Sequence, residues 1–218
     1  MPSRILVINP NSSPAVTAAI DAAVQPLRVA GGPAITVDRL REGPSSIGTQ
    51  RDVESVVMPL AAWVRRDDAD AFVIACFSDP GLHAAREAAG GRPVMGIAEC
   101  GLLRALTLGE RVGIIALSAN SVRRQQRYVR QMGLQARYAG SCPVDASAED
   151  TADESIRDRL ALAARRLTAE HGADVLVLGC AGMAGHRRAL EDLAGCPVVE
   201  PTQQAVIAAL GALLLAGS

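Results

Sequence analysis

Two cysteines, Cys76 and Cys180, stand at the same place in two copies of one sequence pattern. The segments 70–93 and 174–197 align without gaps at a constant shift of 104 residues, since 180 − 76 is 104. In each copy an apolar run ends in the cysteine, as FVIAC and LVLGC, and a turn and a helical pattern follow. A thiol at the end of a buried strand, present twice, predicts a site with one thiol on each side of a ligand.

Paired thiols suit the inversion of a stereocentre next to a carbonyl group. One base removes the proton from one face, an acid delivers a proton to the other face, and fixed donors hold the enolate between the two steps. The reverse reaction exchanges the roles, which favours two identical groups. Backbone N–H groups at a helix start can lower the pKa of a nearby thiol and bind an anion. A single cysteine at a strand end is more often a small core residue, so the duplication carries this interpretation.

Five motifs spread over nearly the whole chain resemble those of the aspartate/glutamate racemase superfamily, and most of all its hydantoin and allantoin racemases. They are INPNSS at 8–13, EGPSSI at 42–47, CFSDPGL at 76–82, GIAE at 96–99 and LGCAGM at 178–183. The resemblance implies two pseudosymmetric α/β lobes, no cofactor, and Cys76 and Cys180 as the paired acid/base residues. It also implies a set of residues that bind the carboxylate or ring carbonyl of the substrate: Asn11, Ser12, Phe77, Ser78, Ser118, Ala181 and Gly182.

Departures from the family pattern bear on the substrate. The amino-acid racemases of the superfamily place Thr-His after the second cysteine, whereas this chain has Ala181 and Gly182. That difference argues against free aspartate or glutamate. Arylmalonate decarboxylases resemble this site but retain only the second cysteine, so the presence of both favours racemisation. After GPSSI this chain has Gly48, where the family members continue with glutamate.

Composition excludes several function classes. A net charge of −1 over 218 residues gives no electrostatic reason to expect nucleic acid or an anionic membrane as a partner. All 22 basic residues are arginine, so no lysine is present to form a Schiff base or complete a P-loop. No signal peptide or membrane-length apolar run is evident, which predicts a cytoplasmic protein acting on a small molecule. Without HExxH or CxxC spacing, no metal site is expected, and the five cysteines favour free thiols.

Apolar runs of strand length alternate with helical patterns along the chain, which is typical of a mostly parallel sheet covered by helices. We predict strands over 5–9, 35–39, 71–76, 94–97, 112–117, 135–139, 175–180 and 198–200. We predict helices over 14–26, 53–66, 81–89, 101–108, 122–132, 151–171, 186–193 and 203–214. Because RVGIIAL at 111–117 resembles RILVINP at 4–10, these elements split into two similar sets of four pairs.

The expected fold is α/β, with two pseudosymmetric lobes that each hold a mostly parallel four-stranded sheet flanked by helices. The first lobe covers 1–98, joined by the C-terminal helix 203–218, and the second covers 99–202. Ligands of parallel sheets bind beyond the carboxyl ends of the strands. The two cysteines lie at such ends, so the active site is predicted in the crevice between the lobes.

Some residues near these ends have two interpretations. Asp79 either orients Cys76 or caps the following helix. Ser118 either binds an anion or caps its helix, with Ser121 as the stronger candidate for the cap. Arg124 lies on a helix with three other arginines, which is typical of a solvated face or of a contact in a homo-oligomer.

The leading hypothesis is a cofactor-independent racemase of a 5-substituted hydantoin or allantoin, with Cys76 and Cys180 as its two bases. One alternative is an arylmalonate-type decarboxylase or a maleate-type isomerase in the same crevice, where one cysteine protonates an enediolate. Another is a non-catalytic two-lobed module that binds a small anion. The decarboxylase or isomerase would release carbon dioxide or isomerise its substrate without racemisation, and the binding module would show tight binding without proton exchange.

Overall fold

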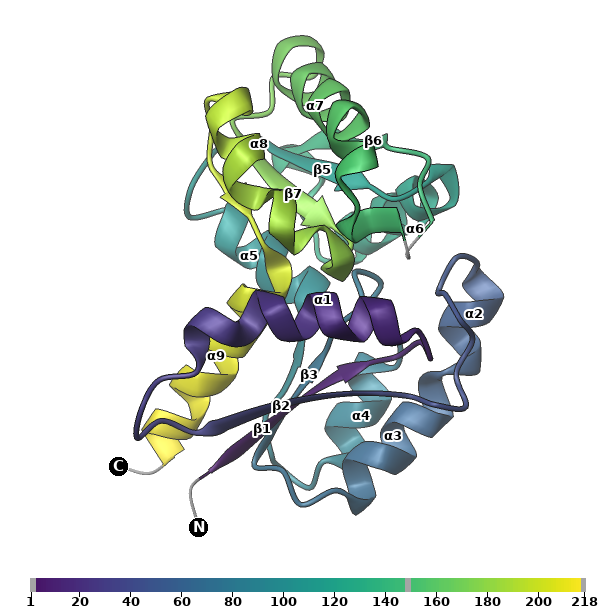
Figure 1. Cartoon of the computed structure of the whole chain (residues 1–218), viewed down its shortest axis with the longest axis vertical. Helices are drawn as coiled ribbons and strands as arrows, with labels where there is room; N and C mark the ends of the chain where they lie inside the picture. Colours follow the sequence, from purple (N-terminus) through teal and green to yellow (C-terminus); the bar gives the residue numbers. More distant parts are fainter. Residues whose placement is uncertain (1–2, 148–149, 217–218) are drawn as a thin grey trace.

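Two four-stranded parallel sheets form the centre of the computed structural model, which describes residues 3–147 and 150–216 (Figure 1). The strand order is β2-β1-β3-β4 in the first sheet and β6-β5-β7-β8 in the second, so the order repeats. The strands are β1 (Arg4–Asn9), β2 (Ala34–Arg39), β3 (Ala71–Ile74), β4 (Val94–Gly96), β5 (Val112–Ala116), β6 (Tyr138–Pro143), β7 (Val175–Gly179) and β8 (Val198–Val199). The predicted fold class, α/β with two similar lobes, is confirmed.

Helices connect the strands and cover both faces of each sheet (Figure 1). The α-helices are α1 (Pro14–Val24), α2 (Gln50–Ser55), α3 (Val57–Arg66), α4 (Leu82–Ala88), α5 (Ile97–Ala105), α6 (Ala119–Gln131), α7 (Arg157–Arg165), α8 (Arg187–Ala194) and α9 (Pro201–Ala216). Short 3₁₀ segments are η1 (Gln25–Leu27), η2 (Gln135–Arg137), η3 (Asp150–Ala152), η4 (Glu154–Ile156) and η6 (Ala181–His186), and η5 (Arg166–Glu170) is a π-helix. No helix among the described residues is long and apolar enough to cross a bilayer.

The duplication extends to the pairing of the strands. Phe72 pairs with Val94 in the first sheet, and Leu176 pairs with Val198 in the second, a shift of 104 residues in both partners. The aspartates that precede the cysteine strands also match. Asp70 accepts a hydrogen bond from the backbone N–H of Arg4 at 2.7 Å, and Asp174 accepts one from that of Arg111 at 2.8 Å. Each aspartate therefore ties the start of its cysteine strand to the first strand of the same sheet.

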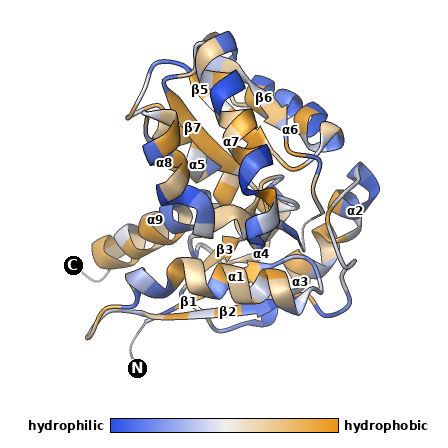
Figure 2. Ribbon diagram, turned by 45° about the horizontal axis from the view of Figure 1, so that its top comes forward, coloured by the Kyte–Doolittle hydropathy of each residue, from blue (hydrophilic) through white to orange (hydrophobic). Residues whose placement is uncertain are grey.

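The central strands are apolar because helices cover both of their faces. Every residue of β3, β5 and β7 is buried, which is the pattern expected for parallel strands inside a sheet. In Figure 2, β5 and β7 are largely hydrophobic and α2, at the edge of the molecule, is largely hydrophilic. Burial on both faces explains why the continuous apolar runs of the sequence predict these strands.

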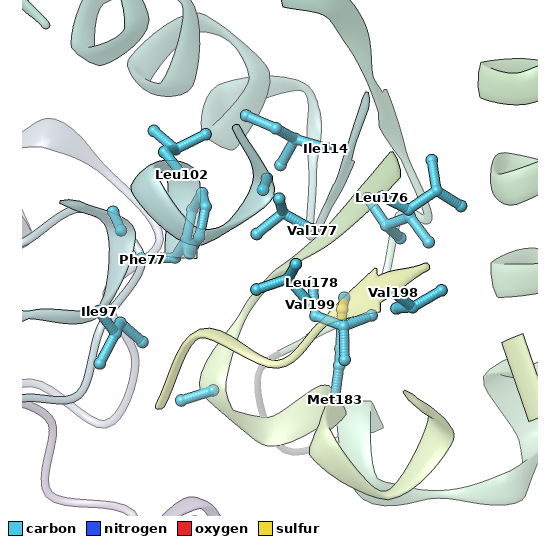
Figure 3. Close-up of a cluster of buried hydrophobic side chains, with 14 of the residues drawn as sticks. Phe77, Ile97, Leu102, Ile114, Leu176, Val177, Leu178, Met183, Val198 and Val199 are labelled. Atoms are coloured by element: carbon cyan, nitrogen blue, oxygen red, sulfur yellow. The ribbon is translucent and has the colours of Figure 1, made fainter. Parts of the chain in front are cut away.

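Two helices cross between the lobes. Helix α5 follows the first sheet but packs on β7 and β8, while α9 follows the second sheet and packs on β1, β3 and β4. The two helices also pack on each other near Gly101, where an added Cβ would lie 2.7 Å from Pro201. Phe77 and Ile97 accordingly belong to the same buried cluster as Val177 of β7 (Figure 3). This exchange places one face of the first sheet in the same core as the second sheet, while its other face packs in a separate cluster.

Several predicted elements differ from the observed ones: the helix predicted over 53–66 is divided into α2 and α3, and the helix predicted over 122–132 begins at Ala119. The strand predicted over 135–139 is η2 followed by β6, because β6 is a half-buried edge strand with little apolar pattern. The helix predicted over 101–108 begins at Ile97 and ends at Ala105. The long helix predicted over 151–171 is divided into η3, η4, α7 and η5. The predicted lobes, 1–98 with 203–218 and 99–202, remain predictions, and residues 1–2, 148–149 and 217–218 of these ranges lie outside the described part.

Candidate active site

Both cysteines line one pocket between the lobes, which we call the cysteine pocket. Its walls come from the ends of β3 and β7, from the loop before α2 and from one face each of α1 and α6. The lining residues are Asn11, Val16, Ser46, Ile47, Ala75, Cys76, Phe77, Ser78, Leu117, Ser121, Arg124, Gln125, Gly179, Cys180 and Ala181. The topology explains this meeting, because the carboxyl ends of β3 and β7 face the same crevice.

The turns after the two cysteines place a backbone donor at each sulfur. The thiol of Cys76 accepts the N–H of Ser78, and the thiol of Cys180 accepts the N–H of Gly182. Ser78 and Gly182 are also 104 residues apart, so the donor is duplicated together with the thiol. In the first lobe the following helix starts only at Leu82, so the contact at Cys76 comes from a tight turn, not from the helix end itself.

Burial dominates the acidity of Cys76. Loss of hydration is the main reason that the pKa of its thiol rises to about 12, and the neighbouring Cys180 and Asp79 contribute to the rise. The N–H of Ser78 and the guanidinium of Arg124 act in the opposite direction. A helix start was expected to lower the thiol pKa, but the apolar surroundings outweigh the local donors. Cys76 is therefore protonated, as a neutral thiol, at neutral pH.

Cys180 has a different set of neighbours. Burial again raises the pKa of its thiol, and the carboxyl group of Glu200 adds to the rise. The N–H of Gly182 and a hydrogen bond with the side chain of Thr151 favour the thiolate. Thr151 is fully buried in η3, and its carbonyl oxygen lies 3.0 Å from Nε2 of His186. Thus a hydroxyl contacts the second thiol where an arginine lies near the first.

A buried carboxylate lies near each of the two cysteines. In the first lobe it belongs to Asp79. Its oxygens accept the backbone N–H groups of Ala98 and Glu99 at 2.9 and 2.8 Å, at the start of α5, and the hydroxyl of Tyr128 at 2.7 Å. Burial raises the pKa of Asp79 to about 6 in spite of these donors, and the charge of Glu99 adds to the rise. Asp79 thus caps α5 across space and not the helix that follows it in sequence.

In the second lobe the same place is taken by Glu200. Its carboxylate accepts the N–H groups of Thr202 and Gln203 at 3.1 and 2.6 Å, at the start of α9. Thr202 and Gln203 are the 104-residue counterparts of Ala98 and Glu99. Burial raises the pKa of Glu200 as well. The two lobes therefore supply one carboxylate to equivalent helix starts from different points of the chain.

Four of the predicted substrate-binding residues line the cysteine pocket: Asn11, Phe77, Ser78 and Ala181. The Asn11 side chain also holds its own turn, since its Oδ1 accepts the N–H of Ser13 at 2.9 Å. Asn11 therefore stabilises its own turn and also lies in the pocket.

The other three predicted residues, Ser12, Ser118 and Gly182, are described but lie outside the lining of this pocket. The N–H of Ser12 donates to the carbonyl of Pro44 at 2.9 Å, and Gly182 contacts Cys180 through its N–H. Ser118 is the N-cap of α6, and its hydroxyl accepts the N–H of Ser121 at 3.3 Å. The expectation that Ser121 is the cap was wrong, because the helix starts earlier and Ser121 is a buried residue of its first turn.

Arg124 corrects an interpretation made from the sequence. It was expected on a solvated face or in an oligomer contact, but it lines the cysteine pocket and reaches into the first lobe. Its guanidinium donates to the carbonyl of Gly48 at 2.8 Å and to Oγ of Ser78 at 3.3 Å. Arg124 therefore joins α6 to the loop before α2 and lies close to Cys76.

Sequence reasoning also missed Gln125 and Thr151. Helix α6 buries Ser121, Gln125 and Val129, which are four residues apart and form one face. A helix whose buried face carries a serine and a glutamine is unusual, and this spacing is the signal that could have indicated a polar pocket. Thr151 offers no such signal, because η3 is a short 3₁₀ segment that reaches Cys180 by packing on η6 and has no helical periodicity of its own.

No group of three or more histidine, cysteine, aspartate or glutamate side chains is placed to hold a metal ion within 3–147 and 150–216. The five cysteines are free thiols. The lining of the pocket offers two thiols, an arginine, hydroxyl groups, two carboxamides and backbone N–H groups.

Two matching α/β lobes with one thiol from each in a shared pocket define a class, the two-lobed racemases. The chain belongs to the Asp/Glu/Hydantoin racemase family, whose model matches residues 5–209, and it is therefore an isomerase. This family agrees with the resemblance drawn from the five motifs.

Individual relatives refine this placement. The chain is 37% identical over 210 residues to a hydantoin racemase of Paenarthrobacter aurescens, a match that covers 93% of this chain and 87% of that protein. It is 36% identical to a hydantoin racemase of Rhizobium meliloti, covering 93% of this chain and 86% of the relative. Among solved structures, the allantoin racemase from Klebsiella pneumoniae superimposes with a TM-score of 0.91 at 31% identity, covering 98% of this chain and 89% of that one.

Proposed function

We propose that this chain racemises a 5-substituted hydantoin or allantoin, with Cys76 and Cys180 as its two acid/base residues and without a cofactor. The observation that carries the proposal is the meeting of both thiols in one pocket. The names of the relatives, hydantoin racemase and allantoin racemase, support this substrate class. The substrate is a small molecule whose proton next to a carbonyl group is the one exchanged.

The reaction needs one thiolate and one thiol at the start. The thiolate takes the proton from the stereocentre, and the electron pair of the C–H bond moves into the ring to form an enolate with its charge on the carbonyl oxygen. The thiol on the opposite face then donates its proton to the same carbon, which inverts the centre. Afterwards the first sulfur is a thiol and the second a thiolate, so the enzyme is ready for the reverse direction.

The neighbours of each sulfur support this exchange of roles. Arg124 and the N–H of Ser78 favour the thiolate of Cys76, while Thr151 and the N–H of Gly182 favour that of Cys180. Loss of hydration opposes both thiolates, so a thiolate formed here is a strong base. Such a base suits a weak carbon acid.

A decarboxylase or geometric isomerase in the same pocket is a weaker proposal. Protonation of an enediolate after loss of carbon dioxide uses one proton donor, so the second thiol in the pocket would have no role. A module that only binds anions would not need a matched pair of thiols either. The two-base racemase uses every feature that the duplication preserves.

The proposal is tested by replacing each thiol with a hydroxyl. We expect Cys76→Ser and Cys180→Ser to lower kcat/KM by about 10³-fold or more in polarimetry of enantiopure hydantoins without added cofactor, since acid–base catalysis contributes about 10²–10⁴. Cys196→Ser, outside the pocket, is the matched control and keeps wild-type turnover. Full turnover in both single variants, or carbon dioxide release by the wild type without racemisation, would refute the proposal.

A further inference from the structure

A carboxamide without a partner lies in the wall of the cysteine pocket. Gln125 is 4% exposed, and its Oε1 has no hydrogen-bond partner among the residues that the structure describes. Buried polar atoms are paired in the great majority of cases, because an unpaired one loses its hydration without compensation. Because Gln125 lines the same pocket as both cysteines, an acceptor in this state points to a partner that arrives with the ligand.

The backbone next to Cys180 makes room for this carboxamide. Residue 179 is glycine, and a Cβ there would lie 2.7 Å from Nε2 of Gln125 and 2.5 Å from the carbonyl oxygen of Ile115. The equivalent residue before Cys76 is Ala75, which carries a Cβ. The second lobe therefore differs from the first by seating an amide group directly at the base of its cysteine turn.

The chemistry of a carboxamide selects its partner. It offers one acceptor and one N–H donor side by side, which matches the cis N–H and C=O groups on one edge of a cyclic amide or imide. A carboxylate offers acceptors only, so it would leave Oε1 unpaired. It would also bring a charged oxygen towards the partial negative charge of Oε1. The pocket thus favours a ring with an N–H over an open-chain dicarboxylate.

We propose that Gln125 binds the N3–H and C4=O edge of a hydantoin ring, with Oε1 accepting from N3–H and Nε2 donating to the C4 oxygen. The inference rests on the proposed function, because it concerns the same pocket and names the part of the substrate that this residue recognises. The C4 oxygen carries the charge of the enolate after proton removal at C5. The Nε2 donor therefore contacts the atom whose charge grows during the reaction.

The test compares 5-isopropylhydantoin with its N1-methyl and N3-methyl derivatives, in racemisation and in calorimetric binding. In the wild type we expect N3-methylation to lower kcat/KM and affinity by about ten- to a hundredfold, because it leaves a buried acceptor unpaired and blocks its space. In Gln125→Met this N3-selectivity falls to about threefold or less. Gln126→Met, an exposed neighbour on the same helix, keeps the wild-type selectivity.

The outcomes separate this inference from the proposed function. Undiminished N3-selectivity in Gln125→Met, or its absence in the wild type, overturns the inference even where racemisation is rapid. Binding with N3-selectivity but no racemisation refutes the proposed function and supports the role of Gln125. Because Oε1 has no partner in the described chain, Gln125→Met is expected to unfold at the wild-type temperature or above. A large fall in this temperature together with loss of all binding would indicate a structural role and contradict the inference.

Discussion

The two cysteine turns share their backbone and differ in the side chains that surround the sulfur. Strand order, the register of the cysteine strands with their neighbours and the N–H two residues after the cysteine are the same in both lobes. Cys76, however, has a guanidinium nearby, whereas Cys180 has the hydroxyl of Thr151. The backbone that positions each sulfur is therefore the same in both lobes, whereas the side chains that stabilise its negative charge differ.

The buried carboxylates extend this comparison. In the first lobe the acid is Asp79 and residue 96 is glycine; at the corresponding places the second lobe has Met183 and Glu200. An added Cβ at Gly96 would collide with both oxygens of Asp79, so the glycine is the space that this carboxylate occupies. Both lobes thus place a carboxylate at the equivalent helix start, but it belongs to Asp79 in the first lobe and to Glu200 in the second.

The largest effect is expected from filling that space. Gly96→Ala should lower the free energy of unfolding by about 3 kcal/mol or more, because it overpacks the core and displaces a buried carboxylate from its donors. Urea unfolding measures the change. Gly211→Ala, where nothing lies within 4 Å in α9, should be neutral or stabilising. A loss below 1 kcal/mol at Gly96, on the order of an ordinary surface change, would contradict the exchange of acids.

The ionisation of Asp79 should leave a pH signature. Its pKa rises on folding from 3.8 to about 6, so the folded state binds more protons in this window and stability falls as the pH rises through it. Relative to Asp79→Asn, the wild type should lose up to about 3 kcal/mol between pH 4 and pH 7.5. Unfolding curves of both proteins across this range measure the difference. A difference that does not change with pH would show that Asp79 titrates alike in both states.

Removal of the cation near Cys76 should slow the reaction. We expect Arg124→Met to lower kcat/KM by about 30- to 100-fold, because it removes a charge that favours the thiolate and a link to the loop at Gly48. Arg124→Lys should recover part of the loss, and its pH–rate profile should remain closer to that of the wild type. Arg130→Met, an exposed position on the same helix, is the control. An unchanged pH–rate profile in Arg124→Met would show that Arg124 does not stabilise the Cys76 thiolate and only holds the loop at Gly48.

The smallest effect is expected at the second thiol. Thr151→Val removes a hydroxyl contact of Cys180 and should lower kcat/KM by about 3- to 10-fold, since a neutral hydrogen bond contributes about 1 kcal/mol. Thr168→Val, whose hydroxyl bonds only its own helix region, is the control. Should Thr151→Val cost as much as Arg124→Met, the proposed difference between the two thiol environments would be wrong.

Much of this architecture could be predicted from the sequence because duplication and periodicity are local signals. The cysteine strands follow from continuous apolar runs that repeat at a fixed shift, whereas the order of the strands in each sheet comes from the structure. Strand β6 was misplaced because it lies at a sheet edge and is only half-buried, so its residues carry little pattern. The split of the helix predicted over 151–171 was missed for a similar reason, since its first part packs on η6 and not on a sheet.

The pocket itself could be predicted only in part. Residues adjacent to the cysteines, such as Phe77 and Ser78, were predicted through the resemblance to the racemase family. Arg124 and Gln125 reach the pocket from α6, whose sequence is dominated by polar residues and resembles a solvated helix. Their role depends on how the two lobes face each other, and a sequence pattern within one lobe does not contain that information.

If two thiols act on opposite faces of the substrate, the proton at the new stereocentre comes from the enzyme and not from the substrate. The origin of this proton in the product is therefore the most informative measurement. A single turnover in D₂O should be followed from each pure enantiomer by mass spectrometry and chiral separation. We expect deuterium at the new stereocentre and protium in the remaining substrate, in both directions. The donor thiol has exchanged its proton with the solvent, while the acceptor thiol holds the proton taken from the substrate. Substantial transfer of the substrate's own proton into the inverted product would indicate a single base and contradict the account.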